Sequence, residues 1–262
     1  MNESLLVIDK VAGPSSFDVV RQVRRLFGGV KVGHAGSLDP FATGVLVLLL
    51  GKATKLSNAL LNADKSYLAT MKLGESTDSM DRTGLVTETK EIPPLTLEQI
   101  GQVLKSYEGE WHQMPPMFSA KKIQGVRLYE LARQNISVPR EKIPVQLYKV
   151  EVLSYEHPLV KFEVHCSKGT YIRSLADDIG KRLGTVAHLH ELKRLSCGDF
   201  SLEDSVTVEE LGKDVNGWRP RGYQNYVKLL SAEGMVRKSP LGVQKAYRHL
   251  PSFEKNDNSL LN

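Results

Sequence analysis

The chain has 262 residues, 41% of them hydrophobic and 25% charged, which is the balance of a globular protein that can bury a substantial core. The longest apolar run, residues 45–50, is too short to cross a membrane, and the N-terminus carries no pattern typical of an export signal. The two cysteines form no Cys-x-x-Cys pair. These features predict a reduced, cytoplasmic protein without a structural zinc site.

The net charge of +5 is concentrated at the C-terminal end. Residues 219–262 hold eight lysines and arginines against three acidic residues, so residues 1–218 are neutral overall. A basic segment on a neutral body is typical of contact with a phosphate backbone, which supplies affinity without sequence specificity. The alternative, a solvated basic tail, remains open.

The N-terminal segment predicts a strand and a helix. Residues 5–8 are apolar and indicate a short strand. Residues 17–27 carry apolar side chains at helical spacing, with Ser16 as the expected N-cap and a Gly-Gly pair as the stop. The other face of this helix carries three arginines, Arg21, Arg24 and Arg25. They are typical of a solvated face, and contact with a nucleic acid is the alternative.

The rest of the chain is organised around residues 32–44. Three glycines in this stretch mark backbone that turns tightly or lies close to another group. Asp39 stands between Leu38 and Pro40, and the proline holds it on a stiffened loop. The apolar run 45–50 then predicts a strand buried on both faces. A carboxylate in this position is typical of a reactive group at the floor of a cleft, and an aspartate that only caps a turn is the alternative.

The next segment predicts two helices, a strand and a loop. Residues 53–63 indicate a short helix, and residues 65–73 alternate as a strand. Residues 74–84 are polar throughout and predict a surface loop. A Thr-x-x-Gln capping box at Thr96 starts the second helix.

Residues 112–142 differ in character from the segments on either side. They are basic and broken by prolines, which predicts a protruding flap that could close on a ligand. Residues 147–155 and 160–166 then indicate two strands, and residues 170–183 a helix. A capping box at Thr207 starts one more short helix, after which the periodicity fades.

Common motifs for phosphate, metal and hydrolytic sites are absent from the sequence. It has no Gly-x-x-x-x-Gly-Lys-Ser/Thr loop, no His-Glu-x-x-His pair and no Gly-x-Ser-x-Gly elbow. The seven histidines, His188 and His190 included, form no pattern typical of a metal cluster. We therefore expect neither a metal ion nor a cofactor.

Four motifs carry a resemblance to a known family. They are GHAGSLDP (residues 33–40) with ATGVL (42–46), KSY (65–67), HCSKGTYIR (165–173) and LKRL (192–195). In this order they resemble the motifs of the TruB-type tRNA pseudouridine synthases, over roughly residues 4–211. Two positions depart from the family pattern: Ala35, where the family usually has Thr, and Val11, where it has Pro.

The resemblance implies that Asp39 is the catalytic aspartate and that Arg173 pairs with it. A guanidinium beside a carboxyl group lowers its pKa, so Asp39 is expected to stay ionised, as a nucleophile or base must. For Arg173, an exposed helix arginine is the alternative. Whether Asp39 adds to the sugar, adds to the uracil ring or only removes a proton is left open.

The resemblance also implies the substrate contacts. Tyr67 is the ring on which the target base stacks, with its hydroxyl near the reacting carbon. Tyr171 and Leu192 touch the flipped nucleotide, and His34 fills the space that the target uridine leaves. From spacing alone, core packing is the more common role for Tyr67. For Leu192, core packing cannot be distinguished from contact with the nucleotide. For His34, proton transfer is the alternative.

The resemblance implies a mixed α/β (α+β) pseudouridine synthase fold, with a largely antiparallel central sheet and flanking helices. We expect a catalytic domain over residues 1–211, with the flap at about 112–142 inserted in it. Residues 212–262 form a short basic appendage, a truncated or divergent form of the family's RNA-binding PUA domain. The expected partner is the T-arm stem-loop of tRNA, bound by a monomer without an obligate protein partner or a membrane.

The implied reaction is cofactor-independent isomerisation of the T-loop uridine at tRNA position 55 to pseudouridine. Because the base must leave its stack to react, base flipping is part of this expectation. A non-catalytic tRNA-folding chaperone is one alternative. A pseudouridine synthase acting on another RNA, such as a guide-dependent enzyme for ribosomal RNA, is the other.

Overall fold

The computed structural model describes residues 3–119, 121–123, 125–134 and 136–215. Within these residues one nine-stranded sheet runs through the molecule. Its main path, in spatial order, is β1 (Glu3–Lys10), β3 (Thr43–Gly51), β12 (Ala187–Cys197), β4 (Lys65–Leu73), β11 (Leu159–Cys166), β10 (Ile143–Glu156) and β7 (Gly109–Gln113). Two short strands, β2 (Val32–His34) and β13 (Phe200–Ser201), pair with β3 and β12.

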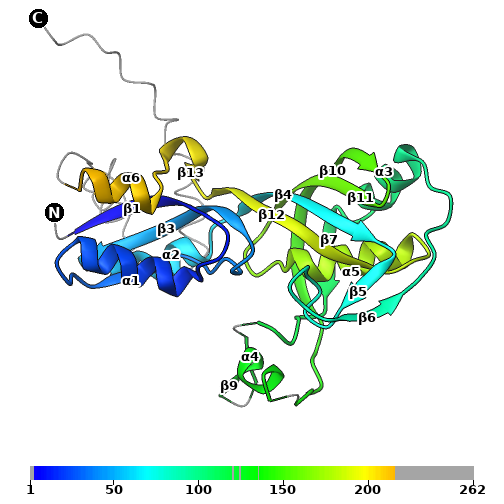
Figure 1. Cartoon of the computed structure of the whole chain (residues 1–262), viewed down its shortest axis with the longest axis horizontal. Helices are drawn as coiled ribbons and strands as arrows, with labels where there is room; N and C mark the ends of the chain where they lie inside the picture. The colour runs from blue at the N-terminus through cyan, green and yellow to red at the C-terminus, as the bar shows by residue number, and fades with distance from the viewer. Residues whose placement is uncertain (1–2, 120, 124, 135, 216–262) are drawn as a thin grey trace, which may run out of the picture.

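The expected fold class is confirmed, because the pairs along this sheet are antiparallel except at one joint. At that joint β12 runs parallel to β3 through two residue pairs, Lys193 with Thr43 and Arg194 with Gly44. The joint divides the molecule into two halves. Figure 1 shows β1 and β3 at one end and β4, β11, β10 and β7 at the other, with β12 passing between them.

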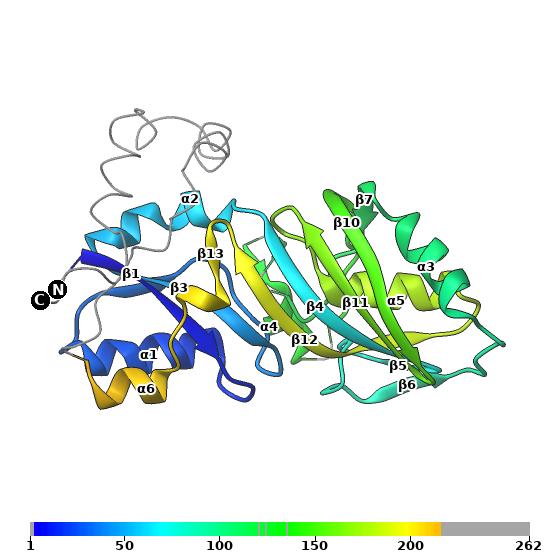
Figure 2. The ribbon, with the colours of Figure 1, turned by 90° about the horizontal axis from the view of Figure 1, so that it is seen from above.

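Helices flank both halves of the sheet (Figure 2). They are α1 (Ser16–Leu26), α2 (Ser57–Leu61), α3 (Leu97–Lys105), α4 (Leu128–Ala132), α5 (Ile172–Arg182) and α6 (Val208–Lys213), with 3-10 turns at Lys52–Leu56 and Leu202–Asp204. In the second half, α5 packs on β12 and α3 on β10. Two hairpins lie outside the main sheet: β5 (Glu75–Thr77) with β6 (Val86–Thr89), and β8 (Lys122–Ile123) with β9 (Val126–Arg127).

The apolar run 45–50 lies inside β3 and is completely buried, as its pattern predicts. Leu46, Leu48 and Leu50 join the core cluster that includes the apolar face of α1. The alternate residues of the run, Val45 among them, join a second cluster with Leu56 and Leu60 beside α2. Because both faces of β3 are covered, the loop before this strand is held firmly at its C-terminal end.

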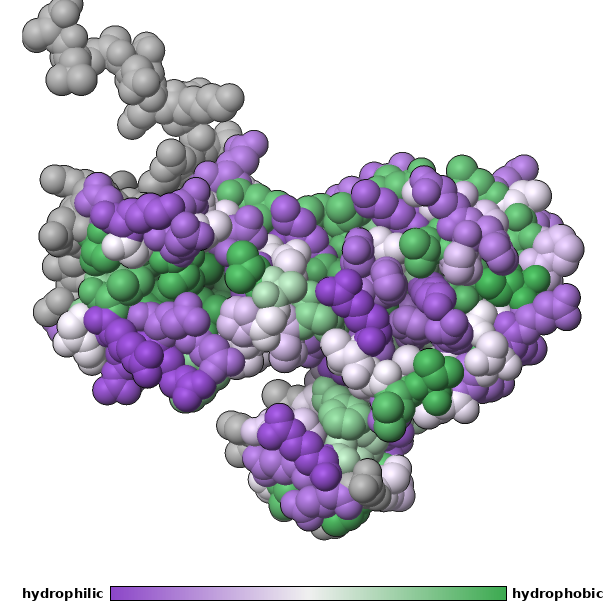
Figure 3. All heavy atoms as spheres, in the orientation of Figure 1, coloured by the Kyte–Doolittle hydropathy of each residue, from purple (hydrophilic) through white to green (hydrophobic). Residues whose placement is uncertain are grey.

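The capping of α1 differs from the prediction by one residue. Ser15, not Ser16, is the N-cap, and it forms a capping box with Asp18. Ser16 is instead buried and binds the loop around Asp39. The three arginines of α1 are exposed, and Figure 3 shows both hydrophilic and hydrophobic surface over this helix.

The prediction that residues 74–84 form a surface loop is wrong. The segment contains β5, and Thr77, Ser79 and Asp81 in it are buried. Its polar groups bond one another: the Asp81 carboxylate accepts from the Ser79 hydroxyl at 2.9 Å and from the main-chain N–H of Thr83 at 2.9 Å. A polar segment of this kind is buried because its hydrogen bonds are satisfied internally.

Residues 114–142, between β7 and β10, carry α4 and the β8–β9 hairpin, which stand away from the sheet in Figure 1. The predicted flap, 112–142, thus begins inside β7. Of the predicted appendage, residues 216–262 lie outside the described part of the chain. No helix in the described part is long and apolar enough to span a membrane.

Candidate active site

A buried cation holds the loop that carries Asp39 from one side. Lys10, at the end of β1, is 1% exposed, and its Nζ donates to the carbonyls of Val11 at 3.0 Å, Pro40 at 3.1 Å and Ala42 at 2.7 Å. Burial lowers its pKa to about 8. The ammonium therefore fixes the backbone on the C-terminal side of Asp39.

A second buried cation holds the same loop from the other side. Arg194 of β12 is also 1% exposed, and its guanidinium donates to the carbonyls of Val45 at 2.6 Å, Gly36 at 3.2 Å and Ser37 at 3.4 Å. Between the two cations, the Ser16 hydroxyl accepts from the Leu38 N–H at 2.8 Å and donates to the Leu38 carbonyl at 3.1 Å. The loop is thus bonded at almost every residue, which preorganises Asp39.

Gly44 is required where β3 meets β12. Its φ is +97°, a conformation that side-chain-bearing residues rarely adopt. A Cβ at this position would lie 2.2 Å from the Arg194 carbonyl oxygen. The glycine therefore allows the two strands to approach closely and brings Arg194 to the loop.

Asp39 and Arg173 form a two-point ion pair. The Nε of Arg173 is 3.0 Å from Oδ2 of Asp39, and an Nη donates to Oδ1 at 3.3 Å. The side chain of Arg173 is 5% exposed, whereas that of Asp39 is 36% exposed. The carboxylate is therefore fixed on its protein side and open to a ligand on the other.

The remaining donors of Arg173 are also bonded. They reach the carbonyls of Ser79 at 3.0 Å and Phe118 at 2.7 Å, and the carboxylate of Asp81 at 3.4 Å. Asp81 is a site residue that the sequence analysis missed. Its flanking hydroxyls, Ser79 and Thr83, are the signal that could have marked it as a buried, bonded carboxylate.

The pKa of Asp39 shifts in the opposite direction to our expectation. Burial raises it, and the nearby charge of Asp81 adds to this effect, while Arg173 and Lys10 oppose it. Although the edge of the carboxylate stays accessible, the surrounding protein lowers the effective dielectric constant around the group. A carboxylate with a raised pKa is a stronger base than a free aspartate, and this property suits proton abstraction or nucleophilic attack.

The structure places the three predicted contact residues on two strands and the start of α5. Tyr67 of β4 is 7% exposed, and it lies beside Arg194, the residue that bonds the loop of Asp39. Leu192 of β12 is 8% exposed and belongs to the same apolar cluster as Tyr67. Tyr171 is the N-cap of α5, two residues before Arg173. Burial raises the pKa of both tyrosines, so they stay neutral hydrogen-bonding groups.

In the part of the chain that the structure describes, His34 forms no hydrogen bond with the ion pair. It ends β2, opposite Leu48 of β3, and its Nδ1 is buried without a hydrogen-bond partner among the described residues. Burial lowers the pKa of His34, and the charge of Arg194 lowers it further. A neutral imidazole that makes no bond to Asp39 in the described structure favours a binding role over proton transfer.

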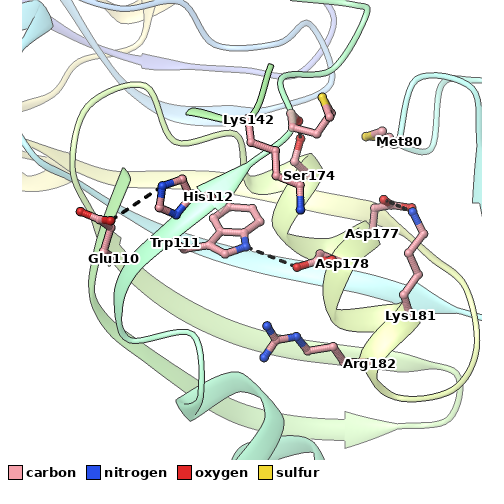
Figure 4. A pocket seen from close by; sticks show the side chains of 11 residues that line it. Met80, Glu110, Trp111, His112, Lys142, Ser174, Asp177, Asp178, Lys181 and Arg182 are labelled. Carbon is pink, nitrogen blue, oxygen red and sulfur yellow. Dashed lines mark hydrogen bonds and ion pairs between the residues drawn. The ribbon is translucent and has the colours of Figure 1, made fainter. Parts of the chain in front are cut away.

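A cavity of about 500 Å³ lies between β7 and α5, and Figure 4 shows its lining. Three of its charged side chains already have partners: Lys181 pairs with Asp177 at 2.7 Å, and Asp178 accepts from the Trp111 Nε1 at 3.3 Å. Ser174 in its wall follows Arg173 directly, so the cavity adjoins the ion pair without containing it. In the described part of the chain, no group of three His, Cys, Asp or Glu side chains is arranged to hold a metal ion.

Comparison with known proteins decides the family. Residues 24–172, more than half of the chain, match the N-terminal domain model of the TruB family pseudouridylate synthases. The chain belongs to this family. Residues 173–230 match a second model, the tRNA pseudouridylate synthase B C-terminal domain.

Curated relatives of the TruB family agree with this assignment. A tRNA pseudouridine synthase B of Chlamydia felis is 48% identical over 79% of this chain and 87% of its own length. One from Protochlamydia amoebophila is 49% identical over 80% of this chain and 79% of its own length. The resemblance drawn from the four motifs is therefore confirmed, and the chain is a pseudouridine synthase.

A solved structure extends the likeness to the fold. The crystal structure of a Cbf5–Nop10–Gar1 complex contains a chain that matches ours with a TM-score of 0.67 and 30% identity. The match covers 94% of our chain and 62% of that chain. Our TruB family chain thus spans less than two thirds of this structural neighbour.

Proposed function

We propose that this enzyme converts the T-loop uridine at position 55 of tRNA to pseudouridine. The observation that carries the proposal is the Asp39–Arg173 ion pair, in which a buried guanidinium holds a partly exposed carboxylate. The names of the curated relatives support tRNA as the substrate, and the four motifs support the T-loop position. Bare tRNA is the proposed partner of a cytoplasmic monomer that needs no protein partner.

The proposed reaction breaks the C1′–N1 bond of the uridine and joins C1′ to C5. C5 loses its hydrogen as a proton and N1 gains one, so the reaction is a balanced isomerisation. To reach Asp39 the uridine must leave its stack, which costs a few kcal/mol and is cheaper in a loop than in a duplex. Asp39 acts as nucleophile or base, Tyr67 and Leu192 contact the base, and Tyr171 borders the ion pair. His34 fills the place that the base has left.

The test is tritium release from C5-labelled uridine in an unmodified tRNA transcript. Wild-type protein should release tritium, and Asp39→Asn should not, because the amide can neither attack nor abstract a proton. A transcript with cytidine at position 55 should release none with either protein. The Asn variant keeps the shape of the side chain, so tRNA binding measured in parallel should persist.

Each other outcome would change one part of the proposal. Binding without release by wild type favours a tRNA-folding chaperone. Release from the transcript with cytidine at position 55 shows that another uridine is the target. Equal release by wild type and Asp39→Asn would overturn the role of Asp39 and leave the reaction standing.

A further inference from the structure

The buried segment that carries Asp81 also carries a cation that the catalytic ion pair does not use. Arg82 follows Asp81 directly, and its N–H donates to the Leu189 carbonyl at 3.0 Å. The Leu189 N–H in turn donates to the Met80 carbonyl at 3.0 Å, and Asp81 and Leu189 form a parallel β-bridge. The backbone of Arg82 is therefore fixed on β12, beside the buried carboxylate that binds Arg173.

The guanidinium of Arg82 lies over the loop that carries Asp39. Its Cζ is 5.9 Å from the ring centroid of Phe41, which follows Asp39 by two residues. Phe41 is 7% exposed, while Arg82 is exposed. Attraction between a guanidinium and an aromatic ring favours this position over the many others that a long side chain can adopt. The positive charge is therefore held on the solvent side of the catalytic loop.

This charge is not neutralised within the described part of the chain. No carboxylate there lies within ion-pair distance of the Arg82 guanidinium, and no side chain or carbonyl there accepts a hydrogen bond from it. The charges that mainly shift the pKa of Asp39 are those of Arg173, Asp81 and Lys10, and that of Arg82 is not among them. Its planar fork of donors is free to bind an anion from solution, and phosphate fits this fork with two parallel bonds.

We propose that Arg82 binds a backbone phosphate of the RNA beside the target uridine. This inference rests on the proposed function, because it takes the substrate to be a nucleotide that is extruded but still attached to its strand. Such a nucleotide keeps a phosphate on each side of its ribose. When the base and C1′ are at Asp39, one of these phosphates lies within reach of a guanidinium above Phe41. The ligand is a phosphodiester, and Arg82 positions the nucleotide without contacting the base.

The first test compares Arg82→Gln, Arg82→Lys and wild type in the tritium-release assay on a T-arm stem-loop. Loss of a charge-assisted phosphate contact should raise KM about tenfold in Arg82→Gln, with a smaller rise in Arg82→Lys, while kcat changes little. The slope of log kcat/KM against log salt concentration should become smaller by about one, the value of one phosphate contact. Arg25→Gln, which removes an exposed arginine from α1, is the matched control and should leave both quantities unchanged. An unchanged KM and salt slope in Arg82→Gln would overturn the proposal.

The second test identifies the phosphate. Stem-loops with a single neutral methylphosphonate, either 5′ or 3′ of the target uridine, are assayed with wild type and Arg82→Gln. Wild type should lose about tenfold in kcat/KM with one of the two substitutions, and Arg82→Gln should be insensitive to that one. A merely structural role for Arg82 predicts equal sensitivity of both proteins at both positions, and that result would overturn the proposal.

The same stem-loops separate this proposal from the proposed function. If wild type releases no tritium, the proposed function fails, and the dissociation constants of the two proteins for each stem-loop are measured by fluorescence anisotropy instead. Loss of phosphate sensitivity in Arg82→Gln would still support the phosphate contact. Identical dissociation constants across all combinations would overturn it.

Discussion

At the scale of single residues, Asp39 and Asp81 share the guanidinium of Arg173. Asp39 takes two of its donors and stays partly open to a ligand, whereas Asp81 is buried and bonded by its neighbours. The family motifs predict Asp39 and Arg173 as site residues, because each lies in a distinctive run of sequence, residues 33–40 and 165–173. Asp81 is not predicted, because the sequence does not distinguish a polar segment that is hydrogen-bonded to water from one whose polar groups bond each other.

The shared guanidinium predicts a change in pH dependence when Asp81 is made neutral. In the proposed reaction Asp39 acts as a carboxylate, so we expect activity to fall as the pH drops through its raised pKa. The negative charge of Asp81 helps to raise that pKa, so Asp81→Asn should lower it and move the acid limb of the kcat profile to lower pH. Asn keeps the acceptor oxygen for Ser79 and Thr83.

Asp78→Asn is the matched control, since Asp78 lies in the same segment but is exposed. Its acid limb should coincide with that of wild type. An acid limb that stays in place or moves to higher pH in Asp81→Asn would contradict the coupling between the two carboxylates.

At the scale of elements, the site depends on how three strands hold one loop. Lys10 ends β1, Gly44 lies at the start of β3, and Arg194 belongs to β12. The sequence predicts these strands from their apolar residues, which alternate where one face is buried and form a continuous run where both faces are buried. It does not predict that Lys10 and Arg194 are buried, because long cationic side chains are usually exposed and their burial depends on carbonyl groups supplied by distant segments.

Gly44→Ala should destabilise the fold far more than an equivalent change at Gly13. Both glycines have positive φ, +97° and +111°, so both substitutions bear the backbone strain of about 1 kcal/mol or more. Only at Gly44 does the new Cβ meet backbone, whereas at Gly13 nothing lies within 4 Å. We expect Gly44→Ala to lose at least about 3 kcal/mol in the free energy of unfolding.

Urea denaturation of the two variants and wild type measures this difference. The strain common to both glycines cancels when the variants are compared with each other. Equal losses at the two positions would show that β12 does not approach β3 as closely as the structure indicates.

At the scale of the whole molecule, a neutral body carries the site and a basic segment follows it. The sequence indicates the mixed α/β class, but not the order of strands in the sheet. That order depends on β12, which is near the end of the described chain and yet inserts between β3 and β4. Pairing between segments so far apart leaves no local pattern, so only the family resemblance supports it in advance.

The basic segment predicts a specific effect on salt dependence. Replacing Arg219, Arg221 and Lys228 by glutamine in the full chain should weaken tRNA binding and reduce its salt slope by up to about two to three counterions. Replacing Arg21, Arg24 and Arg25 of α1 is the matched control, because it removes the same charge from a helix that we expect to be solvated.

Filter binding at several salt concentrations gives both slopes. A smaller slope for the first variant alone assigns the contact to the C-terminal segment. An unchanged slope in that variant would contradict a role for this segment in tRNA binding, and a smaller slope in the control would assign an RNA contact to α1.

The parallel joint between β3 and β12 also joins segments that are synthesised at very different times. Arg194 bonds Val45 across 149 positions of sequence and Ser37 across 157. A ribosome releases the chain from its N-terminus, so Asp39 emerges long before the strand that completes its loop. During most of its synthesis the nascent chain therefore carries Asp39 without the side chains that hold its loop. The loop around Asp39 is therefore complete only after β12 has been translated and has joined β3.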